Sequence, residues 1–188
     1  FRRVLFRSAA KSGRVKGVAD SFYADRRRIV QRPPLTVDQI VALEATVRDV
    51  GRSNYDRIAA GFFLLLVYGR LRYSDGLQLV DLQLDSAERG GRLSGFLEAR
   101  AERTKTSVTL ERKIRFLPVA IPLESLSEPC WVPTWLDLRD EAGLNGRPPH
   151  PMLPSPQLGG GWSPIPLPVG AAGDWMRSLL KIESVARD

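Results

Sequence analysis

The sequence contains very little cysteine and histidine, with one residue of each, Cys130 and His150, among 188. A single thiol excludes a disulfide framework within the chain, and the pair cannot supply the ligands of a structural zinc cluster. Proteins without disulfides are typical of reducing compartments, so we expect a nuclear or cytoplasmic protein. His150 lies between prolines and is interpreted as a loop residue. We expect no metal and no other cofactor.

Long hydrophobic runs are also missing. The longest extends from Phe62 to Tyr68, whereas a transmembrane helix needs about 20 apolar residues. No signal peptide is evident. Hydrophobic residues make up 43% of the chain and charged residues 26%, which is typical of a soluble globular protein. We therefore expect no association with a membrane.

Positive charge is in excess, but it is unevenly distributed. A net charge of +7 favours an acidic partner such as nucleic acid. Residues 1–8 contribute +3, residues 9–32 contribute +5, and residues 33–188 contribute −1. The main body is nearly neutral, so the overall charge does not by itself establish DNA binding.

The first 34 residues differ in composition from the rest. Residues 1–8 resemble the translation of a sequencing-library adapter, and we expect them not to be native; the alternative is a basic N-terminal arm. Residues 9–34 are basic and end in two prolines, which mark a boundary. This segment is either a solvated linker or the end of an N-terminal DNA-binding domain. Its candidate DNA-contacting residues are Arg26, Arg27 and Arg28.

Residues 35–188 show helical patterns around a small region of strands. Thr36 and Gln39 form a capping box that begins a helix, which is expected to end at Gly51. The next helix is apolar nearly all round, so it should be buried. The further expected elements are a short helix at 74–80, strands at 96–101 and 113–121 with 104–109 also able to pair, a helix at 135–142, a loop at 145–170 and a helix at 171–185. The expected fold class is mainly α with a small antiparallel β-sheet, an α+β fold.

The most informative segment runs from Tyr68 to Asp75, with the sequence Tyr-Gly-Arg-Leu-Arg-Tyr-Ser-Asp. Its Arg-x-Ser-Asp pattern, at Arg72, Ser74 and Asp75, resembles the first catalytic-arginine box of tyrosine recombinases. A later segment, Thr104-Lys105-Thr106 before a basic strand with a proline, resembles the β-hairpin lysine of the same family. The two segments, in this order of elements, are similar to an incomplete recombinase catalytic domain over residues 35–188.

The resemblance implies cleavage and rejoining of DNA through a phosphotyrosine intermediate, as in an integrase or a transposon recombinase of a mobile element. Arg72 would bind two non-bridging phosphate oxygens, because a guanidinium presents paired donors and stays charged. Lys105 would protonate the leaving 5′-oxygen as general acid, Asp75 would support the site by hydrogen bonding, and Arg103 would contact DNA. The implied partner is double-stranded DNA, and the resemblance allows a homo-oligomer on it.

The family's His-x-x-Arg box and C-terminal nucleophilic tyrosine have no counterpart in the sequence. All four tyrosines precede the expected sheet: Tyr23, Tyr55, Tyr68 and Tyr73. We therefore interpret the chain as an inactive fragment of a longer recombinase. Two alternatives stay open, an inactive DNA-binding relative and a helical scaffold without a nucleic-acid role. For Arg72 the alternative is a surface ion pair with Asp75, and Arg70 is expected at the surface.

Overall fold

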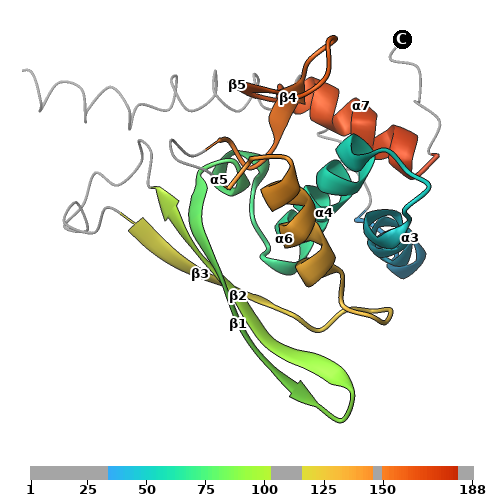
Figure 1. Ribbon diagram of the computed structural model, residues 1–188, viewed down its shortest axis with the longest axis vertical. Coiled ribbons are helices and arrows are strands. Elements are labelled where there is room, and N and C mark those ends of the chain that lie inside the picture. The colour runs from blue at the N-terminus through green and yellow to red at the C-terminus, as the bar shows by residue number, and fades with distance from the viewer. Residues whose placement is uncertain (1–33, 103–115, 146–149, 182–188) are drawn as a thin grey trace, which may run out of the picture. The chain divides into compact units, whose positions relative to one another are not determined.

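The computed structural model describes residues 34–102, 116–145 and 150–181. The chain divides into two units at Pro34, and the helices and strands below belong to the unit that begins at Leu35. In chain order the elements are α3 (Val37–Arg48), α4 (Asn54–Tyr68), α5 (Tyr73–Gly76), β1 (Leu79–Arg89), β2 (Arg92–Glu102), β3 (Phe116–Pro122), α6 (Trp131–Glu141), β4 (Pro154–Pro156), β5 (Trp162–Pro166) and α7 (Val169–Leu179) (Figure 1). An α+β fold with a small antiparallel sheet is therefore confirmed.

The first two helices begin where their capping residues predict. The Gln39 backbone N–H donates to Thr36 Oγ1 at 3.3 Å, and the Thr36 N–H donates to Gln39 Oε1 at 2.9 Å, which completes the capping box of α3. Ser53 caps α4 by accepting the N–H of Asp56 at 3.1 Å. Side-chain caps satisfy backbone donors that a helix cannot pair internally, so local sequence suffices to place these starts. The first helix ends at Arg48, however, before Gly51.

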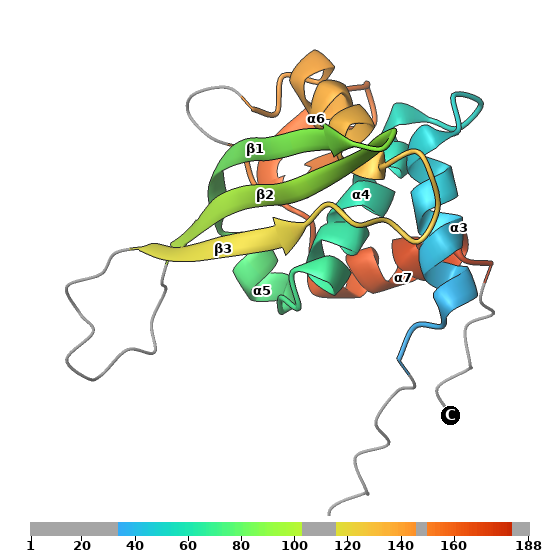
Figure 2. The ribbon, with the colours of Figure 1, turned by 90° about the horizontal axis from the view of Figure 1, so that it is seen from below.

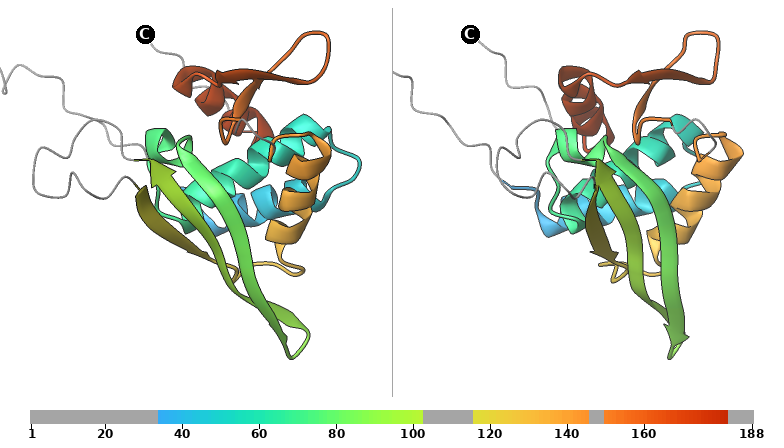
Figure 3. Two further views of the ribbon diagram at one scale, coloured as in Figure 1. Left: turned by 60° about the vertical axis from the view of Figure 1, so that its left-hand side comes forward. Right: turned by 90° about the vertical axis from the view of Figure 1, so that its left-hand side faces the viewer.

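Helix α4 is the centre of the hydrophobic core, as its apolar sequence predicts. Its residues from Ile58 to Leu65 are buried. The sheet lies on one side of α4, and α7 with the β4–β5 hairpin lies on the other (Figure 3). Helix α6 packs closely against α4 at Gly61, because the Trp135 ring occupies the space that a β-carbon would need. The indole N–H of Trp135 donates to the carbonyl of Ile58 at 3.0 Å.

The main sheet has three antiparallel strands in the order β1-β2-β3. Along β2 the buried residues Leu97, Ala99 and Ala101 alternate with exposed residues. Side chains alternate between the faces of a strand, so one face of the sheet is buried and the other faces solvent. The helices cover the buried face (Figure 2), whereas the tip of the β1–β2 hairpin projects away from them (Figures 1 and 3).

The predicted helix at 74–80 is wrong in its second half. Helix α5 ends at Gly76, and β1 begins at Leu79, where no strand was expected. The alternation of apolar Leu82 and Leu84 with polar Gln83 and Asp85 is typical of a strand and could have revealed it. The predicted strand at 96–101 lies within β2, and that at 113–121 overlaps β3; residues 103–115 lie outside the described residues.

Three later boundaries also differ from the sequence prediction. Helix α6 begins at Trp131, not at residue 135, because Pro133 is accommodated in its first turn. The predicted loop at 145–170 contains the β4–β5 hairpin, whose four prolines are tolerated because a two-stranded sheet has only edge strands. Helix α7 begins at Val169 and ends at Leu179, and residues beyond 181 lie outside the described residues.

Candidate functional site

The candidate site begins at the C-terminal end of α4, where the backbone follows a Schellman motif. The Arg70 N–H donates to the carbonyl of Val67 at 3.2 Å, and the Leu71 N–H donates to that of Leu66 at 2.9 Å. Arg70 occupies the left-handed position of the motif with φ 51°. Two hydrogen bonds that close the last turn fix the direction in which the chain leaves the helix.

Arg72 is the first residue after this motif and caps the short helix α5. Its carbonyl accepts the N–H groups of Asp75 at 3.0 Å and Gly76 at 2.9 Å, so its backbone is held on both sides. Its side chain is exposed and forms no hydrogen bond or ion pair with any residue in the described part of the chain. The ion pair with Asp75, which was the alternative role for Arg72, is therefore absent from the structure.

Asp75, predicted to support the site, is exposed on α5. Its Oδ1 accepts the hydroxyl of Ser74 at 3.4 Å, and its carboxylate forms no ion pair with Arg72. The carboxylate is thus close to Arg72 in sequence without orienting the guanidinium.

Tyr73, the residue after Arg72, fixes the turn to the core. Its ring packs edge-on against Phe62 of α4, with centroids 5.7 Å apart and planes at 88°. Its hydroxyl donates to the carbonyl of Leu167, between β5 and α7, at 2.5 Å. Burial raises the pKa of Tyr73 above its usual value, because a phenolate would lose its hydration. The residue after Arg72 is therefore fixed to two distant parts of the fold.

The pairing of β1 with β2 relates this turn to the second predicted segment. Strand β1 begins at Leu79, just after α5, and Leu79 pairs with Ala101 near the end of β2. Helix α5 also contacts β2 directly. The chain therefore leaves β2, toward Lys105, at the end of the sheet where Arg72 lies. Lys105 itself, like Arg103, Arg26, Arg27 and Arg28, lies outside the described residues.

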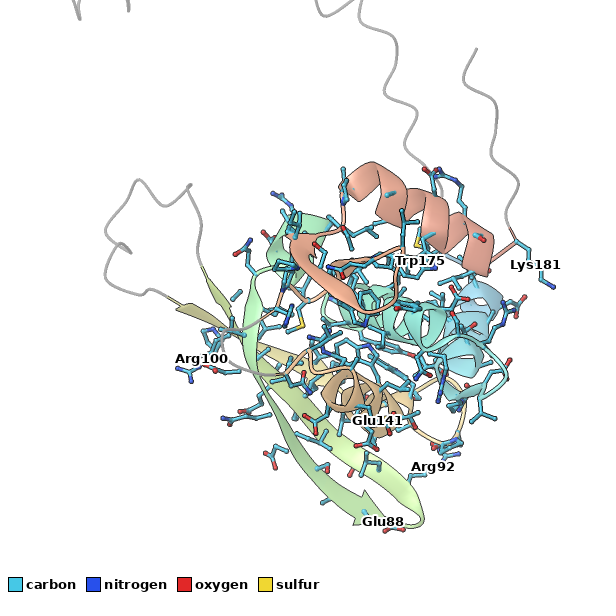
Figure 4. All side chains as sticks on the ribbon, turned by 45° about the horizontal axis from the view of Figure 1, so that its top comes forward. Glu88, Arg92, Arg100, Glu141, Trp175 and Lys181 are labelled. Carbon is cyan, nitrogen blue, oxygen red and sulfur yellow. The ribbon has the colours of Figure 1, made fainter. Side chains whose placement is uncertain are left out.

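A basic residue that the sequence analysis did not single out lies at the same end of the sheet. Arg100 of β2 forms an ion pair with Asp81 of β1 at 2.8 Å, and points outward from the sheet (Figure 4). Asp81 and Leu82 together oppose Ala99, which makes a β-bulge, and Asp81 has φ 55°. Bulges redirect side chains at sheet ends, but the sequence carries no turn residue that would have revealed this one.

Glu44 of α3 forms a second polar cluster, also missed from sequence. It has no exposed surface and accepts hydrogen bonds from the Tyr68 hydroxyl at 2.6 Å, the Leu126 N–H at 3.0 Å, the Ser127 N–H at 2.8 Å and the Ser127 hydroxyl at 2.5 Å. Burial and this carboxylate raise the pKa of Tyr68 well above its usual value. Arg48 donates to the carbonyls of Ser127 at 3.1 Å and Pro129 at 2.6 Å. The cluster fixes the segment after β3.

Arg139 of α6 is a buried cation. It donates to Asn145 Oδ1 at 3.2 Å and to the Met152 carbonyl at 2.7 Å, and lies 5.1 Å from the centroid of the Trp135 ring. Burial lowers the pKa of Arg139 to about 10. With no exposed surface, this guanidinium ties the segment after α6 to the core and cannot meet a ligand.

Comparison of the chain with protein-family models, with curated proteins and with solved structures gave no match. No helix among the described residues is long and apolar enough to cross a membrane. In the same residues, histidine, cysteine, aspartate and glutamate do not gather into a group that could hold a metal ion.

Proposed function

We propose that the chain is part of a tyrosine recombinase catalytic domain and that Arg72 binds the phosphate at which DNA is cut. The observation that carries the proposal is an exposed arginine without a partner among the described residues, on a turn whose backbone is fixed. Exposed arginines are common on protein surfaces. The turn that carries Arg72 differs, because specific backbone hydrogen bonds hold it in one conformation. Positioned donors of this kind typically contribute about 10²–10³ in rate.

The proposed chemistry assigns one role to each predicted residue. The guanidinium of Arg72 would donate two hydrogen bonds to non-bridging phosphate oxygens, where negative charge grows in the transition state. Lys105, three positions beyond Glu102 at the end of β2, would protonate the leaving 5′-oxygen. Arg103 and the 26–28 arginines would contact the DNA backbone. The pairing of Leu79 with Ala101 supports this proposal, because the start of β1, just after Arg72 and α5, lies beside the end of β2, three positions before Lys105 in the sequence.

The nucleophile must come from outside the described residues. Each tyrosine within them already uses its hydroxyl: Tyr68 bonds to Glu44, Tyr73 to Leu167, and Tyr55 contacts the backbone of Gly161. Tyr68 and Tyr73 also have raised pKa values, which oppose formation of the attacking phenolate. In the proposed parent protein, the His-x-x-Arg box and the tyrosine nucleophile lie beyond Asp188.

The test is duplex DNA binding by the 188-residue chain across a salt series, measured by fluorescence anisotropy of a labelled duplex. The affinity of a protein that contacts phosphates falls steeply with salt, and removal of one contact lowers the slope by about 0.9. We expect Arg72→Ala to lower the slope by this amount and to weaken binding at every salt concentration.

The matched control is Arg52→Ala. Arg52 is also an exposed arginine, although it pairs with Asp49 at 3.8 Å, and it precedes α4, whereas Arg72 follows it. The length of the helix, about 22 Å, therefore separates the two positions. We expect Arg52→Ala to leave the slope unchanged. Equal effects of the two substitutions would reduce Arg72 to a general contributor to charge. A chain that binds no duplex even at the lowest salt concentration would overturn the DNA-binding proposal and favour a scaffold.

A further inference from the structure

We propose that Arg70 is a second phosphate-binding residue, so that the turn Arg70-Leu71-Arg72 presents two guanidinium groups to the DNA backbone. The inference rests on the proposed function, because it needs DNA as the partner. It begins from a backbone conformation and not from the predicted motif, in which Arg70 had no role.

The backbone conformation at Arg70 is unfavourable for a residue with a side chain. It has φ 51° at the left-handed position of the Schellman motif, where glycine is the usual residue because a β-carbon crowds the backbone. Its side chain is exposed and makes no hydrogen bond or ion pair within residues 34–102, 116–145 and 150–181. No contact in the described structure therefore compensates for the unfavourable conformation. Lys181 has a similar conformation (φ 52°), so what distinguishes Arg70 is its position two residues before Arg72.

The neighbours of Arg70 direct it toward the same partner as Arg72. Leu71, between the two arginines, is half-buried and packs against the core. In an extended chain the Cα atoms of residues two apart are separated by at most about 7 Å. Two long, exposed side chains that start this close together can reach one phosphate or two neighbouring ones. The turn thus holds two positive charges at the end of α4. Neither guanidinium pairs with an acidic residue in the part of the chain that the structure describes.

A structural explanation competes with this proposal. The C-terminus of a helix carries partial negative charge, and a cation there is favourable. Helix α4 has no basic residue in its last turn, so Arg70 could serve that purpose alone. The two explanations differ in one observable: the helix-dipole explanation assigns Arg70 an effect on stability and none on DNA affinity.

The test is Arg70→Gly, measured by thermal unfolding and by duplex binding across the same salt series. Glycine adopts a left-handed conformation without strain, so we expect the unfolding temperature to stay the same or to rise by about 2–4 °C. We expect DNA binding to weaken at the same time, with a slope lower by about 0.9. Arg70→Lys keeps the charge and should retain most of the slope. A variant that is no less stable but binds less tightly cannot be explained by damage to the fold.

Lys181→Gly is the matched control, because Lys181 is an exposed basic residue with φ 52° that follows α7 in the same way (Figure 4). We expect it to leave the salt slope unchanged. Equal loss of slope in both glycine variants would show a general charge effect and overturn the inference. An unchanged slope in Arg70→Gly together with a lower slope in Arg72→Ala would overturn the inference alone. Unchanged slopes in both would overturn the proposed function as well.

Discussion

Glu44 shows how a single buried carboxylate can hold distant segments together. Burial of a charged group is costly unless hydrogen bonds replace its lost hydration. Glu44 receives four of them, from the hydroxyl of Tyr68 and from the segment at Leu126 and Ser127. The cluster joins α3, α4 and the chain that follows β3. We infer that Glu44 fixes the path by which the sheet returns to the helices.

We expect Glu44→Gln to lower the free energy of unfolding by about 2–4 kcal/mol, since hydrogen bonds to a charged acceptor are the strong ones. The amide nitrogen of the glutamine is a donor. It would face an N–H or O–H group that is also a donor, so neither group would have an acceptor. Urea unfolding followed by tryptophan fluorescence measures the change. Ser127→Ala removes one donor to Glu44 and the acceptor of one Arg48 hydrogen bond, and should cost about 1–2 kcal/mol. A loss below 0.5 kcal/mol for Glu44→Gln, on the order of a neutral surface change, would contradict this account.

Sequence could predict residue roles only where the partner is local. The capping box of Thr36 and Gln39 was predicted and is confirmed, because both partners lie within one helical turn. The Glu44 cluster was not predicted, because its acceptor and its Ser127 donors are 83 positions apart. A glutamate on the apolar side of α3 was the available signal, but a pattern cannot name its partner. The roles of Arg72 and Lys105 stay predictions.

At the scale of elements, the contact between α4 and α6 depends on the absence of a side chain. A β-carbon at Gly61 would lie 2.0 Å from Trp135 Cδ1. The indole cannot yield easily, because it is fully buried and its N–H is bonded to the carbonyl of Ile58. Glycine is therefore required here by the helix crossing, although it weakens a helix.

We expect Gly61→Ala to destabilise the protein by about 2 kcal/mol. Overpacking typically costs about 1–3 kcal/mol, and the clash here is severe, whereas alanine returns about 1 kcal/mol of helix propensity. Gly170→Ala in α7 is the control, because nothing lies within 4 Å of its β-carbon position. That variant should be stabilised by about 0.5 kcal/mol. If thermal and urea unfolding showed both variants to be stabilised, the close packing of α6 on α4 would be wrong.

Elements were predictable from sequence to the extent that one pattern dominated each segment. The segment of α4 is apolar nearly all round, which predicted a buried helix, and its residues from Ile58 to Leu65 are buried in the structure. The sequence predicted a helix at 77–80, because this short apolar stretch fits both the helical period of about 3.6 residues and the strand period of two. The alternation typical of a strand becomes clear only from Leu82 onward. The β4–β5 hairpin was missed, because its prolines indicate loop and its pairing joins Pro154 to Pro166.

At the scale of the whole domain, the site lies where several elements end. Helix α4 leads into Arg70 and Arg72, α5 leads into β1, and the pairing of β1 with β2 returns the chain to the same end of the sheet. On the far side of α4, Trp175 reaches from α7 and donates its indole N–H to Asp56 at 2.7 Å (Figure 4). The turn is thus supported through a helix that is fixed at both ends, which the sequence pattern could not show.

These elements cannot perform one part of the proposed reaction. A guanidinium pair and a general acid stabilise charge and supply a proton, but strand cleavage by covalent capture also needs a nucleophile. The described tyrosines all use their hydroxyls in the fold. We therefore expect 3′ cDNA extension of the transcript beyond Asp188 to encode a His-x-x-Arg box followed by a tyrosine. The two histidine-box residues would complete the donors around the phosphate that Arg72 binds.

The opposite result would separate the remaining alternatives. An extension through a complete domain without the box and the tyrosine would exclude a recombinase, whatever the binding data show. If Arg72→Ala and Arg70→Gly still lowered the salt slope, the chain would be a DNA-binding relative that keeps the phosphate contacts and has lost the chemistry. If neither did, the rigid turn after α4 would serve only to join the helix to the sheet, and the domain would be a scaffold.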